Sequence, residues 1–238
     1  MKRLSYSWFV LIQRSGTKAR TMTVLLWAAL ATPTLAQQTW YVDQSVQGGP
    51  TDGLTWCTAF GRLQDATAVA TPGDTVLVAE GEYRPHADDR SVSFNLTAGV
   101  TWQGGFEGCS ADNDDAQGTG GNSDPKAIVT ILTGDLASND DPLAFPEGAT
   151  FADNSYHVVR VVSGEGAARI EGFTIRGGYA ESEILGDAGG GIVAESGDVI
   201  VTACLFEFNF AGRGAAIHKA GGWLEVVNSI FRRNSALR

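Results

Sequence analysis

The C-terminal part of the chain contains three segments that align with one another without gaps. They are residues 170–180, 201–211 and 226–236. A second element recurs between them, at residues 189–192 and 214–217, and its spacing equals that of the last two segments. Self-similarity at a regular spacing of this kind indicates a repeat architecture, in which each unit buries its apolar face by stacking on its neighbours.

The pattern inside each copy favours strands over helices. The apolar runs are short, rich in β-branched side chains and bounded by Gly or Asn, which is typical of strands. No copy has ten or more residues of helical period, so helical and leucine-rich repeats fit poorly. Two apolar positions should stack in register: Ile170, Val201 and Val226, and then Ile175, Phe206 and Phe231. The sequence therefore predicts an all-β fold, a right-handed parallel β-helix, which is a solenoid of stacked strand layers.

Turn-forming residues recur between and after these apolar positions. A bend is expected at the small or turn-forming residues Gly172, Ala203 and Asn228. A later shared position, which suits a backbone with positive φ, is occupied by Gly178, Asn209 and Asn234. The position between them is shared by Phe173, Cys204 and Ser229. We therefore expect Cys204 to be a buried hydrophobic residue of the core.

The first 36 residues have the features of an export signal. They contain five Lys or Arg and no acid, with a short apolar run at residues 24–31 and small residues at 34–36. This order is that of a secretory signal peptide. The apolar run is shorter than the roughly 18 residues of a membrane span, although residues 7–12 add a second apolar patch and leave an uncleaved anchor open. We expect a secreted or cell-surface protein without a transmembrane span after signal removal.

The charge balance excludes some classes of partner. The whole chain has 17 basic and 27 acidic residues. Removal of the five basic residues in the signal leaves 12 against 27, a net charge of −15. A surface this acidic repels nucleic acid and anionic lipid. No basic stripe with interleaved aromatic residues is present in the sequence, so we expect no nucleic-acid partner.

The chain has three cysteines, of which two lie outside the repeats. In an exported protein, a disulfide between Cys57 and Cys109 would tie the N-terminal cap to the first strand layers. Pairing depends on a geometry that the sequence does not give, so the disulfide and two free thiols both remain open. No pair of cysteines has the spacing of metal ligands.

The stretch ahead of the repeats contains a predicted helix and several predicted strands. Residues 60–70 place Phe60, Leu63, Thr67 and Ala70 on one helical face, and the Pro-Gly pair at 72–73 ends the helix. Such a helix would cover the open end of the first layer. Strands are expected at residues 40–43, 75–79, 93–96, 100–104, 127–132 and 156–162. The expected organisation is a signal peptide at 1–36, an N-terminal cap at 37–74 and the parallel β-helix at 75–238.

A series of short motifs resembles a known family. The motifs are Tyr41–Asp43, Asp52–Trp56, Leu63–Ala66, Gly73–Tyr83, Gly104–Phe106, Leu132–Leu136, Asp153–Val159, Gly172–Gly178 and Gly189–Ile192. Their order is similar to that in bacterial surface and secreted right-handed β-helix proteins, the polymorphic outer-membrane-like or pectin-lyase-like repeat proteins. The resemblance implies the fold and export, while the biochemical role of the family is largely unassigned. Relatives usually carry more repeats and a C-terminal anchoring region, so the resemblance implies that this sequence is truncated at its C-terminus.

Similar β-helices include polysaccharide lyases and glycoside hydrolases. Such a lyase needs a basic residue near the substrate's uronate carboxylate together with Ca²⁺ held by carboxylates, and a hydrolase needs paired carboxylates on one face. At the repeat offsets Arg176, Glu207 and Arg232 align, a column that we interpret as a charge ladder on a solvated face. An arginine facing clustered acids on adjacent layers would favour the lyase. We assign no catalytic and no cofactor-binding residue from the sequence.

Acidic residues are concentrated in one stretch. Between Glu107 and Asp153 there are ten acids and one base, with runs at residues 112–115 and 139–141. Oxygen-rich loops suit Ca²⁺, yet neither run has EF-hand spacing, so a Ca²⁺ site and a plain solvated loop both remain open. His86 and His218 lie in loop or turn contexts, and we expect His157 to pack rather than to react.

Together these features predict an exported structural or interaction module that binds a polysaccharide or a cell-surface protein. The alternative is a polysaccharide-degrading enzyme of the pectate-lyase type. The long faces of a solenoid suit either partner, and this expectation rests on analogy at the level of the fold.

Overall fold

The computed structural model describes residues 36–46, 51–109, 128–181 and 188–237. In this part of the chain the fold is all-β, and α1 (Leu63–Val69) is its only α-helix. The described strands form four sheets in which every strand pair is parallel. The signal peptide expected at residues 1–36 falls, apart from its last residue, outside the described residues.

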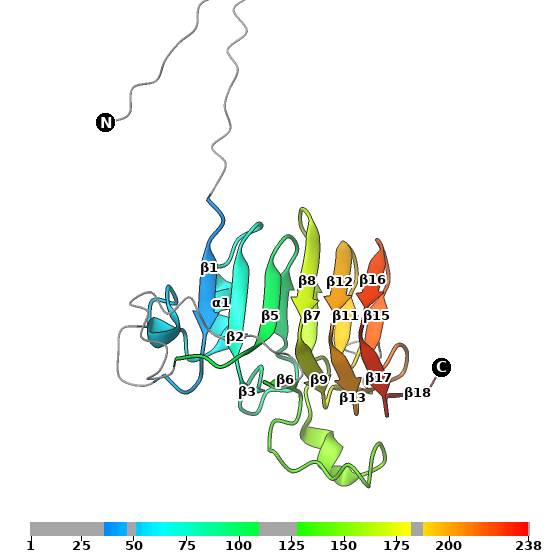
Figure 1. Ribbon diagram of the computed structural model, residues 1–238. Helices are drawn as coiled ribbons and strands as arrows, with labels where there is room; N and C mark the ends of the chain where they lie inside the picture. Colours follow the sequence, from blue (N-terminus) through cyan, green and yellow to red (C-terminus); the bar gives the residue numbers. More distant parts are fainter. Residues whose placement is uncertain (1–35, 47–50, 110–127, 182–187, 238) are drawn as a thin grey trace, which may run out of the picture. The chain divides into compact units, whose positions relative to one another are not determined.

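Each sheet collects strands from distant parts of the sequence (Figure 1). In spatial order, the six-stranded sheet contains β1 (Thr39–Val42), β2 (Thr75–Ala79), β5 (Thr101–Phe106), β8 (Ala167–Glu171), β12 (Asp198–Thr202) and β16 (Leu224–Val227). The five-stranded sheet contains β3 (Gly81–Tyr83), β6 (Thr130–Thr133), β9 (Phe173–Arg176), β13 (Leu205–Glu207) and β17 (Ile230–Arg232). The four-stranded sheet contains β4 (Phe94–Thr97), β7 (Val159–Val162), β11 (Ile192–Ala194) and β15 (Ile217–Lys219). The three-stranded sheet contains β10 (Tyr179–Ala180), β14 (Phe210–Ala211) and β18 (Ser235–Ala236).

The register between strands confirms the alignment of the repeats. The two apolar positions are paired across neighbouring strands, as Ile170–Val201–Val226 in the six-stranded sheet and Ile175–Phe206–Phe231 in the five-stranded sheet. In the second column the rings of Phe206 and Phe231 are stacked with their centroids 4.9 Å apart. The shorter repeat element is paired as well, since Ile192 lies opposite Ile217. Like residues therefore meet like residues across the strand layers, and this pairing stacks the apolar side chains into continuous columns.

Positive φ angles mark the bends of the repeat. The first expected bend is confirmed, because φ is 76° at Gly172, 51° at Ala203 and 50° at Asn228. The second expectation, positive φ at Gly178, Asn209 and Asn234, is wrong by one residue. Positive φ occurs instead at Gly177 (71°), Phe208 (52°) and Arg233 (51°). The bend therefore lies one residue earlier than expected in all three copies.

The two asparagines form a hydrogen-bonded ladder between layers. Asn209 is fully buried, and its Nδ2 donates to Ile175 O at 2.9 Å and to Asn234 Oδ1 at 3.0 Å. Its Oδ1 accepts from the backbone N–H of Gly178 at 3.1 Å. In turn, Asn234 Nδ2 donates to Phe206 O at 2.9 Å. Each asparagine thus pairs backbone groups that would otherwise be buried without a partner at the bend.

The core lies between the sheets. Its largest fully buried side chains include Trp102, Phe94, Phe173, Phe206 and Ile170, and burial of each contributes roughly 1.5–3 kcal/mol. Cys204 is buried in the same cluster, as expected from its position in the repeat. Burial also raises the pKa of its thiol to about 12, so Cys204 is an inert apolar residue at neutral pH.

The N-terminal end of the core is covered by α1. The helix is shorter than the predicted span of residues 60–70, and its fully buried residues are Leu63 and Ala66. Phe60 cannot belong to it, because the Phe60 backbone exchanges hydrogen bonds of 2.9 Å with Tyr41 and Asp43 along β1. The six-stranded sheet already begins with β1, inside the stretch 37–74. The structure also contains a disulfide between Cys57 and Cys109 beside this end of the sheet, 52 residues apart in sequence.

The opposite end of the described strands lacks such a cover. The outermost strands there are β15, β16, β17 and β18. Residues at core positions of the repeat are exposed on them, with Val226 at 41% and Phe231 at 47%. The equivalent Val201 and Phe206, one layer inward, are fully buried.

The ladder makes a specific stability prediction. Replacing Asn209 by Ala removes the acceptor of the buried Gly178 N–H and a donor to the Ile175 carbonyl, which should lower the free energy of unfolding by about 1–3 kcal/mol. Asn234→Ala is the matched control, since Asn234 lies on the partly exposed last layer where water can replace the lost bonds, and should cost less. Urea unfolding of both variants checks this. Equal losses would show that burial of the ladder is not the cause.

Candidate functional site

The candidate site lies where three neighbouring strands of the five-stranded sheet end. Thr133 ends β6, Arg176 ends β9 and Glu207 ends β13. Arg176 is paired in register with Thr133 on one side and with Glu207 on the other. These three polar side chains therefore stand side by side on neighbouring layers, about 4.8 Å apart in the hydrogen-bonding direction.

The segment that connects β6 and β7, residues 134–158, contains the 3₁₀ helix η2 (Ala149–Asp153) and lies beside these strand ends (Figure 1). Its aromatic residues anchor this β6–β7 loop. Phe145 contacts Phe151 and Phe208 at centroid distances of 5.3 and 5.6 Å, and Phe151 stacks on Tyr179 at 6.0 Å. The Tyr179 hydroxyl donates to the backbone oxygen of Pro146 at 3.0 Å. The loop is thus packed against two sheets rather than free in solvent.

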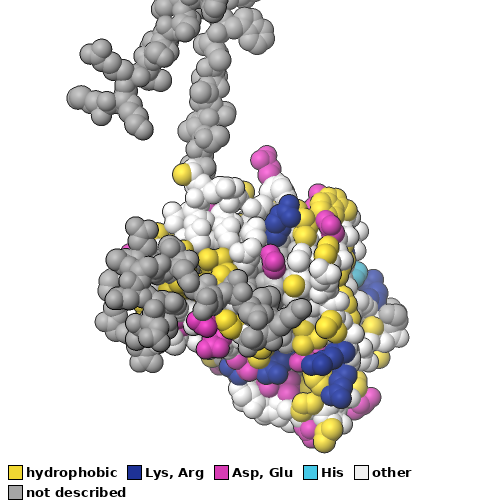
Figure 2. Space-filling view, viewed as in Figure 1, with side chains coloured by type: hydrophobic (Ala, Val, Ile, Leu, Met, Phe, Trp, Pro, Cys, Tyr) yellow, Lys and Arg dark blue, Asp and Glu magenta, His cyan; other side chains and the backbone are white. Residues whose placement is uncertain are grey.

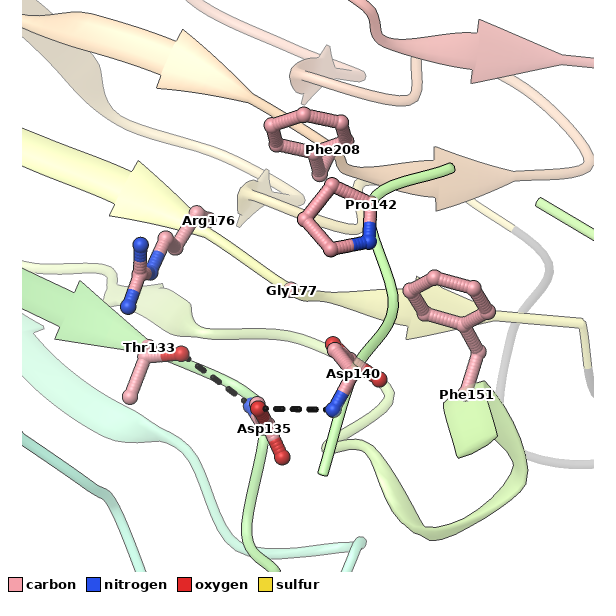
Figure 3. A pocket seen from close by; sticks show the side chains of 8 residues that line it. All are labelled: Thr133, Asp135, Asp140, Pro142, Phe151, Arg176, Gly177 and Phe208. Atoms are coloured by element: carbon pink, nitrogen blue, oxygen red, sulfur yellow. Dashed lines mark hydrogen bonds between the residues drawn. The ribbon is translucent and has the colours of Figure 1, made fainter. Parts of the chain in front are cut away.

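Between the loop and the strand ends lies a small cavity of about 90 Å³ (Figure 3). It is lined by Thr133, Asp135, Asp140, Pro142, Phe151, Arg176, Gly177 and Phe208. One side carries two carboxyl groups and a guanidinium group, and the other carries two aromatic rings and a proline ring (Figure 3). Polar groups at one wall and ring faces at another are a combination that recognises a small, partly apolar and hydroxylated group.

The carboxyl groups of Asp135 and Asp140 are positioned by the loop backbone. The backbone N–H of Asp135 donates to Thr133 Oγ1 at 3.2 Å. The carboxylate of Asp135 accepts from the N–H groups of Asn139 at 3.1 Å and of Asp140 at 3.3 Å. These bonds curl the start of the loop so that both acids line one cavity.

Among the residues that line this cavity, Asp140 has a carboxyl group with a strongly shifted pKa. Burial raises its pKa to about 7, with smaller contributions from the negative charges of Asp135 and Asp153, while its hydrogen bond from Asn154 and the positive charge of Arg176 act in the opposite direction. Asn154 Nδ2 donates to Asp140 Oδ2 at 2.8 Å. At neutral pH this carboxyl group therefore exists in both protonation states, which is the condition under which a carboxyl group can give or take a proton.

Ion pairs link Arg176 to its neighbours on the outside of the sheet. Arg176 contacts Glu82 at 2.8 Å, and Arg84 contacts the same carboxylate. Further along, Arg232 contacts Glu207 at 2.7 Å. Basic and acidic side chains accordingly lie next to one another on the lower part of the molecule in Figure 2. The predicted alignment of Arg176, Glu207 and Arg232 is confirmed by the strand register.

Other residues singled out from the sequence lie away from this cavity. Cys57 and Cys109 form the disulfide beside β1 of the six-stranded sheet. His157 is buried with Nδ1 3.0 Å from Gly189 O, which fits the expected packing role. The Nδ1 of His86, for which the sequence suggested no partner, lies 3.1 Å from Asp88 Oδ1. The expected loop or turn context of His218 is wrong, because His218 lies in β15 and pairs with Val193 of β11.

The structure describes only one of the two acidic runs noted in the sequence. The run at residues 112–115 lies outside the described residues. The run at 139–141 supplies Asp140 to the cavity. Sequence reasoning noted this run but missed its approach to Arg176 and the contribution of Asp135. The only signal was that Asp135 follows a predicted strand, and this does not reveal where the loop turns.

Metal-ligand clusters and membrane-spanning helices are both absent from the described residues. No group of three or more His, Cys, Asp or Glu side chains is arranged to hold a metal ion among residues 36–46, 51–109, 128–181 and 188–237. In the same part of the chain no helix is both long and apolar enough to cross a membrane.

Comparison of the chain with protein-family models, with curated proteins and with solved structures finds no match. The interpretation of the site therefore rests on its own geometry and chemistry.

The acidity of Asp140 predicts a pH-dependent effect on stability. Its folded-state pKa of about 7 exceeds the ordinary aspartate value of 3.8, so the folded protein holds a proton that the unfolded chain releases, and stability falls as pH rises from about 4 to 7. The substitution Asp140→Asn removes this pH-dependent loss of stability. The new amide oxygen can still accept the hydrogen bond from Asn154 Nδ2. The variant should therefore gain stability relative to the wild type between pH 4 and 8, measured by urea unfolding in a chelating buffer.

The matched control for this prediction is Asp89→Asn. Asp89 is exposed, and hydrogen bonds from Ser91 lower the pKa of its carboxyl group, so this substitution should bring no such gain above pH 4. A difference between Asp140→Asn and wild type that does not change with pH would contradict the prediction.

Proposed function

We propose that this chain is a right-handed parallel β-helix exported to the cell surface or the medium, in the manner of the bacterial β-helix repeat proteins that its motifs resemble. The parallel pairing of strands that lie one repeat apart in sequence supports the solenoid, because each sheet receives one strand from each successive repeat. Parallel strands joined by a crossover are right-handed in the great majority of proteins, which supports the handedness. The basic and apolar segment at residues 1–36 supports export.

The function that the site supports best is binding of a glycan by this module. The observation that carries it is the cavity lined by Asp135, Asp140 and Arg176 together with the rings of Phe151 and Phe208. Sugars offer hydroxyl groups to carboxylates and guanidinium groups on their edges, and C–H surfaces to aromatic rings on their faces. The volume of about 90 Å³ is well below the roughly 300–1,000 Å³ of pockets that enclose a whole ligand. The site therefore suits one sugar unit of a longer chain.

A second candidate is a polysaccharide lyase. One observation favours it, because Arg176 lies at a cavity with Asp135 and Asp140 from the neighbouring layer and its loop. A lyase would use a basic group to take the proton next to a uronate carboxylate. However, an arginine side chain is effectively always protonated in proteins, and Arg176 is already paired with Glu82, so it is a poor base. Binding without turnover remains the better-supported function.

The test compares two arginines of one column. Arg176 lines the cavity, whereas Arg232 lies two strands further along the same sheet and is paired with Glu207 outside the cavity. Arg176→Ala should weaken binding of neutral and acidic oligosaccharides about tenfold or more, since it removes charge-assisted hydrogen bonds. Arg232→Ala should leave binding unchanged. Calorimetric titration of the folded protein without residues 1–36 measures both.

The same variants also distinguish glycan binding from a protein partner and from lyase activity. Absence of glycan binding by the folded protein, or equal losses in both variants, would contradict the proposed site and leave a protein partner as the better hypothesis. Unsaturated products released from pectate or alginate, and lost in Arg176→Ala, would instead establish the lyase.

A further inference from the structure

The β6–β7 loop contains buried oxygen atoms that no hydrogen bond satisfies. Among the described residues, four side-chain oxygen atoms of this loop are buried and have no hydrogen-bond partner: Asp140 Oδ1, Thr150 Oγ1, Asn154 Oδ1 and Ser155 Oγ. All four lie between positions 140 and 155. Burial of an oxygen atom without a hydrogen-bond partner costs free energy. Several such atoms in one loop therefore indicate a site for a ligand that binds oxygen atoms.

Two of these atoms belong to side chains that touch each other. Asn154 is fully buried, and its amide is directed at Asp140, to which Nδ2 donates at 2.8 Å. Asn154 is itself held in place, since its backbone oxygen accepts from Arg90 Nε at 2.6 Å and its N–H donates to Phe151 O at 3.3 Å. The Oδ1 atoms of Asp140 and Asn154 are thus two fixed oxygen atoms on a single hydrogen-bonded pair of side chains.

The charge around this pair favours a cation. The negative charges of Asp135 and Asp153 both act on Asp140, and Arg176 is the cation that opposes them. Arg176 is also engaged with Glu82, so its charge is shared. The carboxylates of Asp135 and Asp153 each accept N–H groups of the loop, which holds them near Asp140. Against the three carboxyl groups of Asp135, Asp140 and Asp153 stand two guanidinium groups, those of Arg176 and Arg90. Arg90 donates to Asn154 O and lies 3.8 Å from Glu181.

We propose that the Asp140–Asn154 pair forms a Ca²⁺ site that closes the β6–β7 loop onto the end of the five-stranded sheet. A carboxylate oxygen and an amide oxygen are hard ligands, which exclude the softer transition metals and suit Ca²⁺. Ca²⁺ generally takes six to eight oxygen ligands. The pair would supply two of them, and the remainder would come from water and backbone oxygen atoms. The role of the ion is structural, and the proposal does not depend on glycan binding.

The experiment titrates the folded protein, freed of metal by a chelator and then dialysed, with Ca²⁺ at pH 8. We expect about one strong site per chain by calorimetry, an increase in Tm with Ca²⁺ concentration by mass action, and slower proteolysis within residues 134–158. Asp140→Asn should abolish all three effects. Asn154→Asp replaces the neutral amide oxygen by a charged one and should bind Ca²⁺ more tightly than the wild type.

Asp89→Asn is the matched control, because it removes an equal charge from an aspartate whose carboxylate already accepts two hydrogen bonds from Ser91. It should bind Ca²⁺ as the wild type does. The proposal is overturned if the folded wild-type protein binds no Ca²⁺. It is equally overturned if Asp140→Asn retains binding, which would place the ion elsewhere, or if Asp89→Asn loses it to the same extent, which would indicate unspecific attraction to an acidic surface.

Discussion

The structure depends on parallel backbone pairing between strands one repeat apart. This pairing fixes the register, and the register brings equivalent residues of successive repeats into columns, such as Ile175, Phe206 and Phe231. A shift by one residue would turn every apolar side chain to the opposite face of its sheet. The bends and the Asn209–Asn234 ladder follow from this register. Each bend recurs at the equivalent residue of successive repeats, and this brings the two asparagines within hydrogen-bonding distance.

The candidate site is built on that framework by a loop that does not follow the repeat. The strand ends present Thr133 and Arg176 side by side, and this part of the site is as regular as the sheet. The β6–β7 loop then adds Asp135 and Asp140, held by hydrogen bonds within the loop, and the Phe151 ring. A regular scaffold carrying an irregular loop is a common way to position functional groups, because the scaffold supplies rigidity and the loop supplies variety.

Much of the sheet structure could be predicted from the sequence, because like residues at a fixed offset reveal the register directly. The site could not. The approach of Asp140 to Arg176 depends on contacts of Phe145 and Phe151 with distant rings, and no periodic pattern encodes such contacts. Local errors have a similar origin. Phe60 was assigned to a helix from its spacing, whereas its backbone pairs with β1, and tertiary pairing overrides local propensity.

The two ends of the described stack differ in how they are closed, and this has a mechanical consequence. At the N-terminal end the core is covered by α1, and the Cys57–Cys109 disulfide joins the cap to the strand region. At the other end β16 and β17 have a neighbour on one side only. A force that pulls on the two ends of residues 36–237 would pass through the disulfide, so the segment between Cys57 and Cys109 would carry no load.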